Sequence, residues 1–380
     1  MEAVDTSSQI LTGVGESPHL PTATGLAPRV DWIDCCRGIG IWLVFFGHVL
    51  QSLTRLDLVN IRAPYHLIYA FHMPMFFMMA GFFFKPEDTL LRSTGRLALR
   101  RLLPVVFYSV LLLPLWSLGP LIHGQSPWPR IEPELAGYVL GLPELNWVTW
   151  FLVCLFVCEC MALICLPVIK GRGFQLLFGA ICIGLGAQLC TSTAASGHLV
   201  GVDSHAWFLC EAVVALGFYA IGHAIYPWLQ GMASHTGRAL ILFVAGMAYT
   251  LATFRMNAPT PSFVVMMSAS QHGNPMSFAL TALAGSLSIW GLSMAIAQAF
   301  GSKLLQELGQ RSLILLGLNG VFYHFVNPAL AMHRPPPDRL GPILVFALLL
   351  SVVSLLACWP ITNLLQRYVP QLVGQPQRRG

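Results

Sequence analysis

Apolar stretches alternate along this chain with short segments that contain proline, glycine and charged residues. Ten of the stretches approach the roughly 20 residues that an α-helix needs to cross the hydrocarbon core of a bilayer. They are Gly38–Leu53, Tyr65–Phe84, Leu97–Leu118, Trp147–Ile169, Phe174–Cys190, Trp207–Trp228, Arg238–Phe254, Pro275–Phe300, Ser312–Met332 and Leu340–Leu365. A further run, Pro261–Ser270, is too short to span and is expected to be re-entrant or interfacial. The pattern predicts an all-α, polytopic membrane helix bundle with about ten transmembrane helices.

The two ends of the sequence differ from this pattern. Residues 1–28 are polar, with glycine, serine, threonine and proline throughout and no apolar core of a signal peptide. We expect them to form a disordered cytoplasmic tail. Residues 29–367 are expected to form one transmembrane domain, and residues 368–380 a short basic cytoplasmic tail.

Composition agrees with a membrane protein and excludes a water-soluble globule. Hydrophobic residues make up 56% of the chain and charged residues only 10%, whereas soluble domains carry about 25% charged residues. Most of the ten cysteines lie inside apolar runs and lack the paired spacing of a zinc site, so we expect reduced structural thiols. Nothing in the sequence indicates a metal or a nucleic-acid partner.

The distribution of basic residues predicts the orientation in the bilayer. With the N-terminus inside, only six of the 21 lysines and arginines fall in outside connections, and the other fifteen fall in inside segments. The six are Arg55, Arg62, Arg130, Arg255, Arg334 and Arg339. Because positively charged loops stay in the cytoplasm, both termini are predicted to be cytoplasmic.

Ionisable side chains inside the predicted spans are the candidates for chemistry, since each is costly in lipid unless it faces protein or water. They are His48, His66, His72, Glu159, Glu211, His223 and His324. Any one of them can also serve simply to hold helices together through a hydrogen bond.

Arg37 and His48 form the most informative pair. They are eleven positions apart, which at 100° per residue is about 1100°, or three turns plus roughly 20°, so both lie on one helix face. The corresponding rise is ~16 Å, which places Arg37 at the cytoplasmic mouth and His48 near the middle of the membrane. Arginine suits phosphate and histidine suits proton abstraction. The structural alternative is that Arg37 is an interfacial anchor beside Asp34 and His48 is a packing residue.

Two motifs stand out along the chain. The first runs from Arg29 to His48 and contains Asp34, the pair Arg37-Gly38, an apolar run and the pair Gly47-His48. It resembles the first helix of the membrane acyltransferase-3 family. The second, Phe71-His-Met-Pro-Met-Phe-Phe-Met-Met-Ala-Gly-Phe82, is similar to the family's F-H-M-P-L-F-F-x-x-S-G segment, with Ala80 where serine is usual. Weaker similarities begin at Trp150, Leu216 and Leu308, so the resemblance covers nearly everything after the N-terminal tail.

The resemblance implies transfer of an acyl group, usually acetyl from cytosolic acetyl-CoA, to a hydroxyl of a polysaccharide or lipid-linked glycan precursor. The enzyme would be a multi-pass protein of the bacterial inner membrane. His48 would then be the general base, because a sugar hydroxyl is a poor nucleophile near pH 7. His72 would orient the thioester, contact the acceptor or assist His48, and the alternative is that it packs helices beside a kink at Pro74. The candidates for binding CoA phosphates are Arg37, Arg96, Arg100 and Arg101, and those for binding or orienting substrate are Asp34, Glu159, Glu211 and His324.

Other functions remain open at this stage. An exopolysaccharide acetyltransferase of the xanthan kind is one subtype, and a different acceptor, such as a cyclic glucan or a peptidoglycan sugar, is another. A proton-coupled transporter or flippase could use the same buried histidines and glutamates as a relay, although no inverted repeat is visible. An acyl-cysteine intermediate on Cys35 or Cys36 is disfavoured because no base lies nearby in the sequence.

Overall fold

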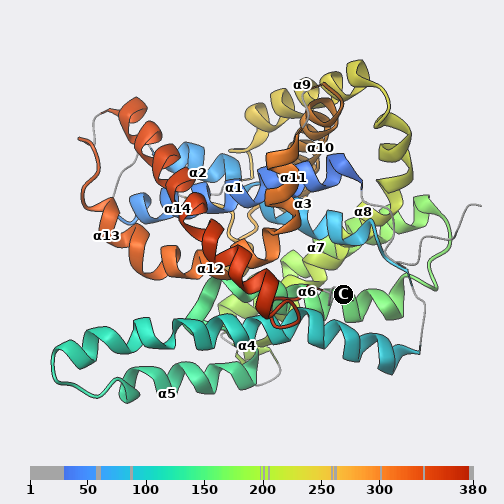
Figure 1. The fold of residues 1–380 in the computed structure, drawn as a ribbon. Coiled ribbons are helices and arrows are strands. Elements are labelled where there is room, and N and C mark those ends of the chain that lie inside the picture. The colour runs from blue at the N-terminus through green and yellow to red at the C-terminus, as the bar shows by residue number, and fades with distance from the viewer. Residues whose placement is uncertain are drawn as a thin grey trace, which may run out of the picture. The chain divides into compact units, whose positions relative to one another are not determined.

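The computed structural model describes residues 30–56, 61–85, 89–196, 198–199, 202–203, 206–257, 260, 263–299, 302–336 and 339–375 (Figure 1). Residues 31–380 form one compact unit. The predicted tail of residues 1–28 lies outside the described residues, as do residues 376–380 of the predicted basic tail.

The structure is built from helices and one small hairpin. The α-helices are α1 Asp31–Thr54, α2 Arg62–Tyr69, α3 His72–Gly81, α4 Leu90–Ile122, α5 Trp128–Gly137, α6 Trp150–Cys165, α7 Arg172–Ser196, α8 Leu209–Met232, α9 Thr236–Thr253, α10 Pro275–Ala299, α11 Lys303–Gln310, α12 Ser312–Val321, α13 Asn327–Ala331 and α14 Leu340–Tyr368. Shorter 3-10 turns are η2 Tyr138–Leu140, η3 Glu144–Thr149, η4 Ala206–Phe208 and η5 Met267–Ala269, and η6 Phe322–Val326 is a π-helical turn. The two-residue strands β1 His198–Leu199 and β2 Val202–Asp203 pair antiparallel.

Among the described residues, nine helical segments are long and apolar enough to cross a membrane. The chain is therefore a polytopic helical membrane protein, as the apolar pattern predicts. Nine of the ten predicted spans correspond to these segments, and the span Ser312–Met332 is the α12–η6–α13 segment.

The remaining predicted span, Tyr65–Phe84, is not one continuous helix. It consists of α2 and α3, which are separated by Ala70 and Phe71. Phe71 leaves the helical conformation with φ −141°, and Pro74 lies in the first turn of α3, where the missing amide hydrogen of a proline costs little. The described part of Pro261–Ser270, residues 263–270, contains the turn η5 and does not span.

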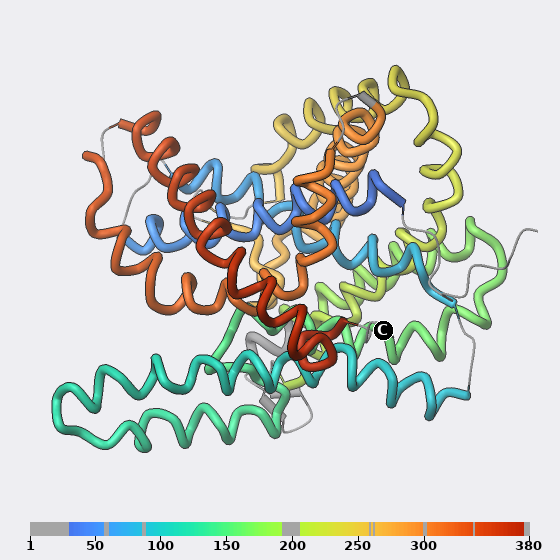
Figure 2. The backbone as a smooth tube through the Cα atoms, in the orientation of Figure 1, coloured from blue at the N-terminus to red at the C-terminus, as the bar shows by residue number. Residues whose placement is uncertain are grey.

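Helix α1 lies at the centre of the compact unit and packs against α10, α11 and α14. Its contact with α11 is very close, because a Cβ on Gly38 would lie 2.1 Å from the carbonyl oxygen of Leu305, and one on Gly309 would lie 1.8 Å from that of Asp34. Only glycine allows this backbone approach. Two further pairs, α7 with α8 and α9 with α10, run side by side along much of their length (Figure 2).

Candidate functional site

Arg37 and His48 lie on one uninterrupted helix, α1, which runs from Asp31 to Thr54. The ~16 Å rise expected from their spacing therefore also separates Arg37 from His48 along the axis of α1 in the structure. The Arg37 side chain is 34% exposed, whereas His48 is half-buried among neighbouring helices.

The guanidinium of Arg37 is held by its own helix. Its Nη1 lies 3.3 Å from Oδ1 of Asp34, one turn earlier. The other carboxylate oxygen of Asp34 accepts a hydrogen bond of 3.1 Å from Nε2 of Gln310, on α11. The ring of Phe83 lies 5.5 Å below the guanidinium carbon. Asp34 thus bonds to Arg37 and to α11, while a third of the Arg37 side chain is exposed.

His48 is held by a residue from another part of the sequence. Its Nδ1 makes a hydrogen bond with Oδ1 of Asn319, on α12. An amide oxygen can only accept, so Nδ1 of a neutral His48 carries the hydrogen and Nε2 keeps its lone pair. The ring of Tyr323, in η6, stands edge-on to His48 at 4.9 Å between centroids.

His72 is the first residue of α3 and is buried. Its Nδ1 donates to the carbonyl oxygen of Ile68 at 2.9 Å, and its ring packs against Tyr69 at 4.7 Å. The Tyr69 hydroxyl in turn donates to Oε1 of Gln51, on α1, at 3.1 Å. The break between α2 and α3 therefore brings His72 toward the half of α1 that carries His48.

The three arginines predicted to help bind CoA phosphates lie on α4 in different surroundings. Arg96 and Arg100 are exposed. Arg101 instead donates to both carboxylate oxygens of Glu159, on α6, at 2.8 and 2.7 Å. Such a two-pronged bond uses the same fork that would hold a phosphate, so Glu159 is the structural partner of Arg101.

Glu211 belongs to a separate buried cluster at the start of α8. The hydroxyl of Ser270 donates to its Oε1 at 2.6 Å. His272 is 3% exposed, and burial lowers its pKa to about 4 even though the Glu211 carboxylate acts in the opposite direction. Across the part of the chain that the structure describes, no three His, Cys, Asp or Glu side chains group as metal ligands.

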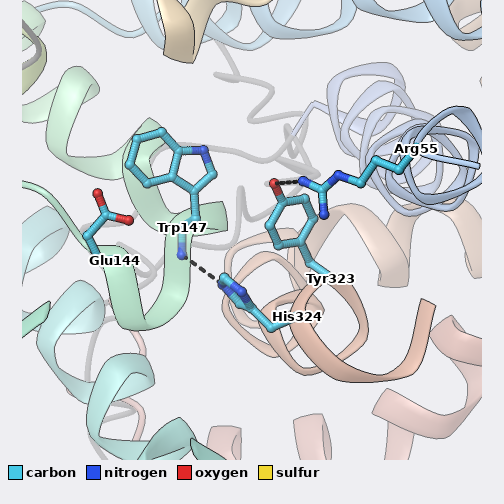
Figure 3. Close-up of a pocket in the computed structure, with 5 residues that line it drawn as sticks. All are labelled: Arg55, Glu144, Trp147, Tyr323 and His324. Atoms are coloured by element: carbon cyan, nitrogen blue, oxygen red, sulfur yellow. Dashed lines mark hydrogen bonds between the residues drawn. The ribbon is translucent and has the colours of Figure 1, made fainter. Parts of the chain in front are cut away.

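His324 lines a cavity of about 340 Å³ together with Arg55, Glu144, Trp147 and Tyr323 (Figure 3). Its Nε2 accepts a hydrogen bond of 3.1 Å from the backbone N–H of Trp147, which places the hydrogen of a neutral His324 on Nδ1. Arg55 donates to the Tyr323 hydroxyl at 3.2 Å. Since Tyr323 also touches His48, the cavity adjoins the histidine of the Arg37–His48 pair.

Several residues of this region are not found by looking for ionisable groups inside membrane spans. Asn319 and Tyr323 are uncharged, and Arg55 and Glu144 lie in connections between predicted spans. The feature of the sequence that could identify Asn319 is its amide side chain within an apolar run, because an asparagine inside the membrane requires a hydrogen-bond partner. Asn319 has that partner in His48.

Comparison with known proteins identifies a family for most of the chain. The family model described as an acyltransferase domain, acyltransferase-3, matches residues 30–363. Curated proteins and solved structures gave no match. The match covers the second motif and all of the first motif except Arg29. The chain therefore belongs to the acyltransferase-3 family.

Proposed function

We propose that this acyltransferase moves an acetyl group from cytosolic acetyl-CoA to a hydroxyl of a polysaccharide or lipid-linked glycan precursor, in the bacterial cytoplasmic membrane. His48 serves as the general base and Arg37 binds a phosphate of CoA. Membership of the family supports acyl transfer in general.

The observation that carries the proposal is the hydrogen bond from His48 to Asn319. A general base must present an unprotonated nitrogen to its substrate. With Nδ1–H donating to Oδ1 of Asn319, the lone pair of Nε2 is free to accept the proton of an acceptor hydroxyl. The same bond becomes stronger when His48 takes up that proton, because a charged donor makes a stronger hydrogen bond.

The reaction balances without a further reagent. The acceptor hydroxyl gives its proton to Nε2 of His48 as its oxygen forms a bond to the thioester carbonyl carbon. The carbon–sulfur bond then breaks, and the leaving thiolate takes the proton back from the imidazolium. The products are the acetyl ester and CoA with a free thiol, and His48 returns to its neutral form.

Arg37 supports the donor assignment by its position and exposure. Its guanidinium lies at the end of α1 where the positive-inside rule places the cytosol, and a third of its side chain is open to solvent. A planar guanidinium binds two phosphate oxygens at once. An extended pantetheine arm reaching from that phosphate along α1 would bring the thioester toward His48.

The test is acetyl transfer by purified full-length protein supplied with radiolabelled acetyl-CoA and a panel of glycans. We expect label in the glycan with wild type and loss of nearly all label with His48→Ala. Arg37→Gln should raise the KM for acetyl-CoA. The controls are His123→Ala and Arg172→Gln, two exposed positions, both of which should behave as wild type.

Two results would contradict the proposal. Undiminished transfer in His48→Ala would exclude His48 as the base. Movement of a glycan across proteoliposomes without consumption of acetyl-CoA would instead support the transporter alternative.

A further inference from the structure

The cavity lined by Arg55, Glu144, Trp147, Tyr323 and His324 approaches His48 from the end of α1 opposite to Arg37. Arg55 directly follows the last residue of α1, Thr54. The rise from Arg37 to Thr54 is ~26 Å. Tyr323 belongs both to the wall of the cavity and to the immediate surroundings of His48. A molecule in the cavity would therefore lie one side chain away from His48, at the end of α1 opposite to Arg37.

The lining suits a molecule rich in hydroxyl groups. Arg55 and the Nδ1–H of His324 are donors, the Tyr323 hydroxyl both donates and accepts, and Glu144 supplies carboxylate oxygens. Trp147 and Tyr323 stand on either side of the cavity with His324 between them (Figure 3). Aromatic walls with a few placed polar groups are typical of small-molecule sites, and the charged groups oppose an acyl chain.

The wall that carries Trp147 is built with unusual backbone conformations. The Trp147 ring packs against Phe208 at 5.8 Å between centroids. Phe208 and its neighbour Trp207 have φ values of 50° and 53°, which bulky side chains seldom adopt. Trp207 in turn lies over Gly141, where a Cβ would be only 2.7 Å from the indole ring. Such strain persists where the surroundings impose it and gathers at ligand sites.

We propose that this cavity binds a pyranose unit of the acceptor, and that Tyr323, held by Arg55, positions the acceptor hydroxyl toward His48. The acceptor then enters from the end of α1 opposite to the donor, and Trp147 provides the flat surface for the sugar ring. This inference rests on the proposed function, because it assigns the second substrate of the same reaction.

Steady-state kinetics of the full-length protein in detergent tests the assignment. The probes are methyl β-glucopyranoside, methyl α-mannopyranoside and cellobiose, each varied against acetyl-CoA. Loss of one hydrogen bond in Tyr323→Phe should raise the KM for the saccharide roughly fivefold to tenfold, and Trp147→Leu should raise it at least as much. Both variants should leave the KM for acetyl-CoA unchanged. Tyr368→Phe, at an exposed position on α14, is the matched control.

The outcomes separate the cavity assignment from the proposed function. Suppose that wild type transfers acetyl. The cavity assignment is then wrong if neither variant alters the KM for the saccharide. It is also wrong if both variants alter the KM for acetyl-CoA and leave the KM for the saccharide unchanged. If wild type transfers no acetyl to any probe, the Tm measured with and without each saccharide decides whether the cavity binds sugar. If a saccharide raises the Tm of wild type but not that of Trp147→Leu, the cavity is a saccharide site and acetyl transfer to sugars is refuted. No rise in Tm overturns the cavity assignment.

Discussion

Replacing Asn319 by leucine removes the acceptor that fixes the tautomer of His48 while keeping a side chain of similar size. Asn319 is fully buried, and its Oδ1 accepts from Nδ1 of His48. Its Nδ2 has no hydrogen-bond partner among the described residues, so the bond to His48 is the interaction that the variant loses. We therefore expect Asn319→Leu to fold and to act slowly.

The size of the effect follows from the change in that bond during the reaction. A hydrogen bond between neutral groups contributes about 1 kcal/mol, and one from a charged donor about 1.5–3 kcal/mol. The bond therefore stabilises the transition state, in which His48 gains a proton, by ~0.5–2 kcal/mol more than the ground state. This corresponds to a decrease in kcat of roughly 2- to 30-fold. The KM for acetyl-CoA should not change.

A second substitution separates positioning from packing. Asn319→Asp keeps the shape but places a carboxylate beside the imidazole, which favours the protonated form of His48. The acidic limb of the pH–rate profile should then move to higher pH. Asn327→Leu is the control, since Asn327 is also buried and its Oδ1 has no partner among the described residues. An unchanged pH profile in Asn319→Asp, or a kcat for Asn319→Leu equal to that of Asn327→Leu, would refute the reasoning.

Three further predictions concern stability. Glu159→Gln should destabilise the protein by about 3 kcal/mol, because it leaves the charge of Arg101 without its partner, and chemical denaturation should show this. Gly222→Ala should lower the Tm, because the added Cβ would lie 2.1 Å from the carbonyl oxygen of Met78, and overpacking of this kind costs about 1–3 kcal/mol or more. His272 should make stability pH-dependent. Its pKa of about 4 in the folded protein lies below the usual 6.5, so the unfolded chain takes up the proton first. Stability should fall by ~3 kcal/mol between about pH 7 and pH 4 and then level off.

Each of these predictions has a variant or outcome that checks its cause. The double change Arg101→Met with Glu159→Leu should recover much of the lost stability, since an apolar pair removes the unpaired charge. Gly231→Ala, on the same helix with open space around it, should be neutral or stabilising. A His272→Gln variant should show a flatter dependence on pH, and an equal slope in the variant would assign the effect to other groups.

The sequence predicted the fold class well because each membrane span is a local property. About 20 apolar residues in a row suffice to identify a helix that crosses lipid, and nine of the ten predicted spans are such segments in the structure. The prediction of one helix over Tyr65–Phe84 was wrong, because the break at Phe71 is a backbone change within an apolar run and leaves no change in hydropathy. The orientation of the bundle in the bilayer stays a prediction.

The sequence by itself also determined that Arg37 and His48 share one face of a helix, since eleven residues make close to three whole turns wherever the helix lies. Only the tertiary structure decided which side chains from other helices contact these residues. Asn319 is 271 positions from His48, Glu159 is 58 positions from Arg101, and the cavity beside Tyr323 is assembled from the end of α1, η3 and η6. The spacing of residues along one helix fixes which of them face the same way, whereas their partners depend on how separate helices pack.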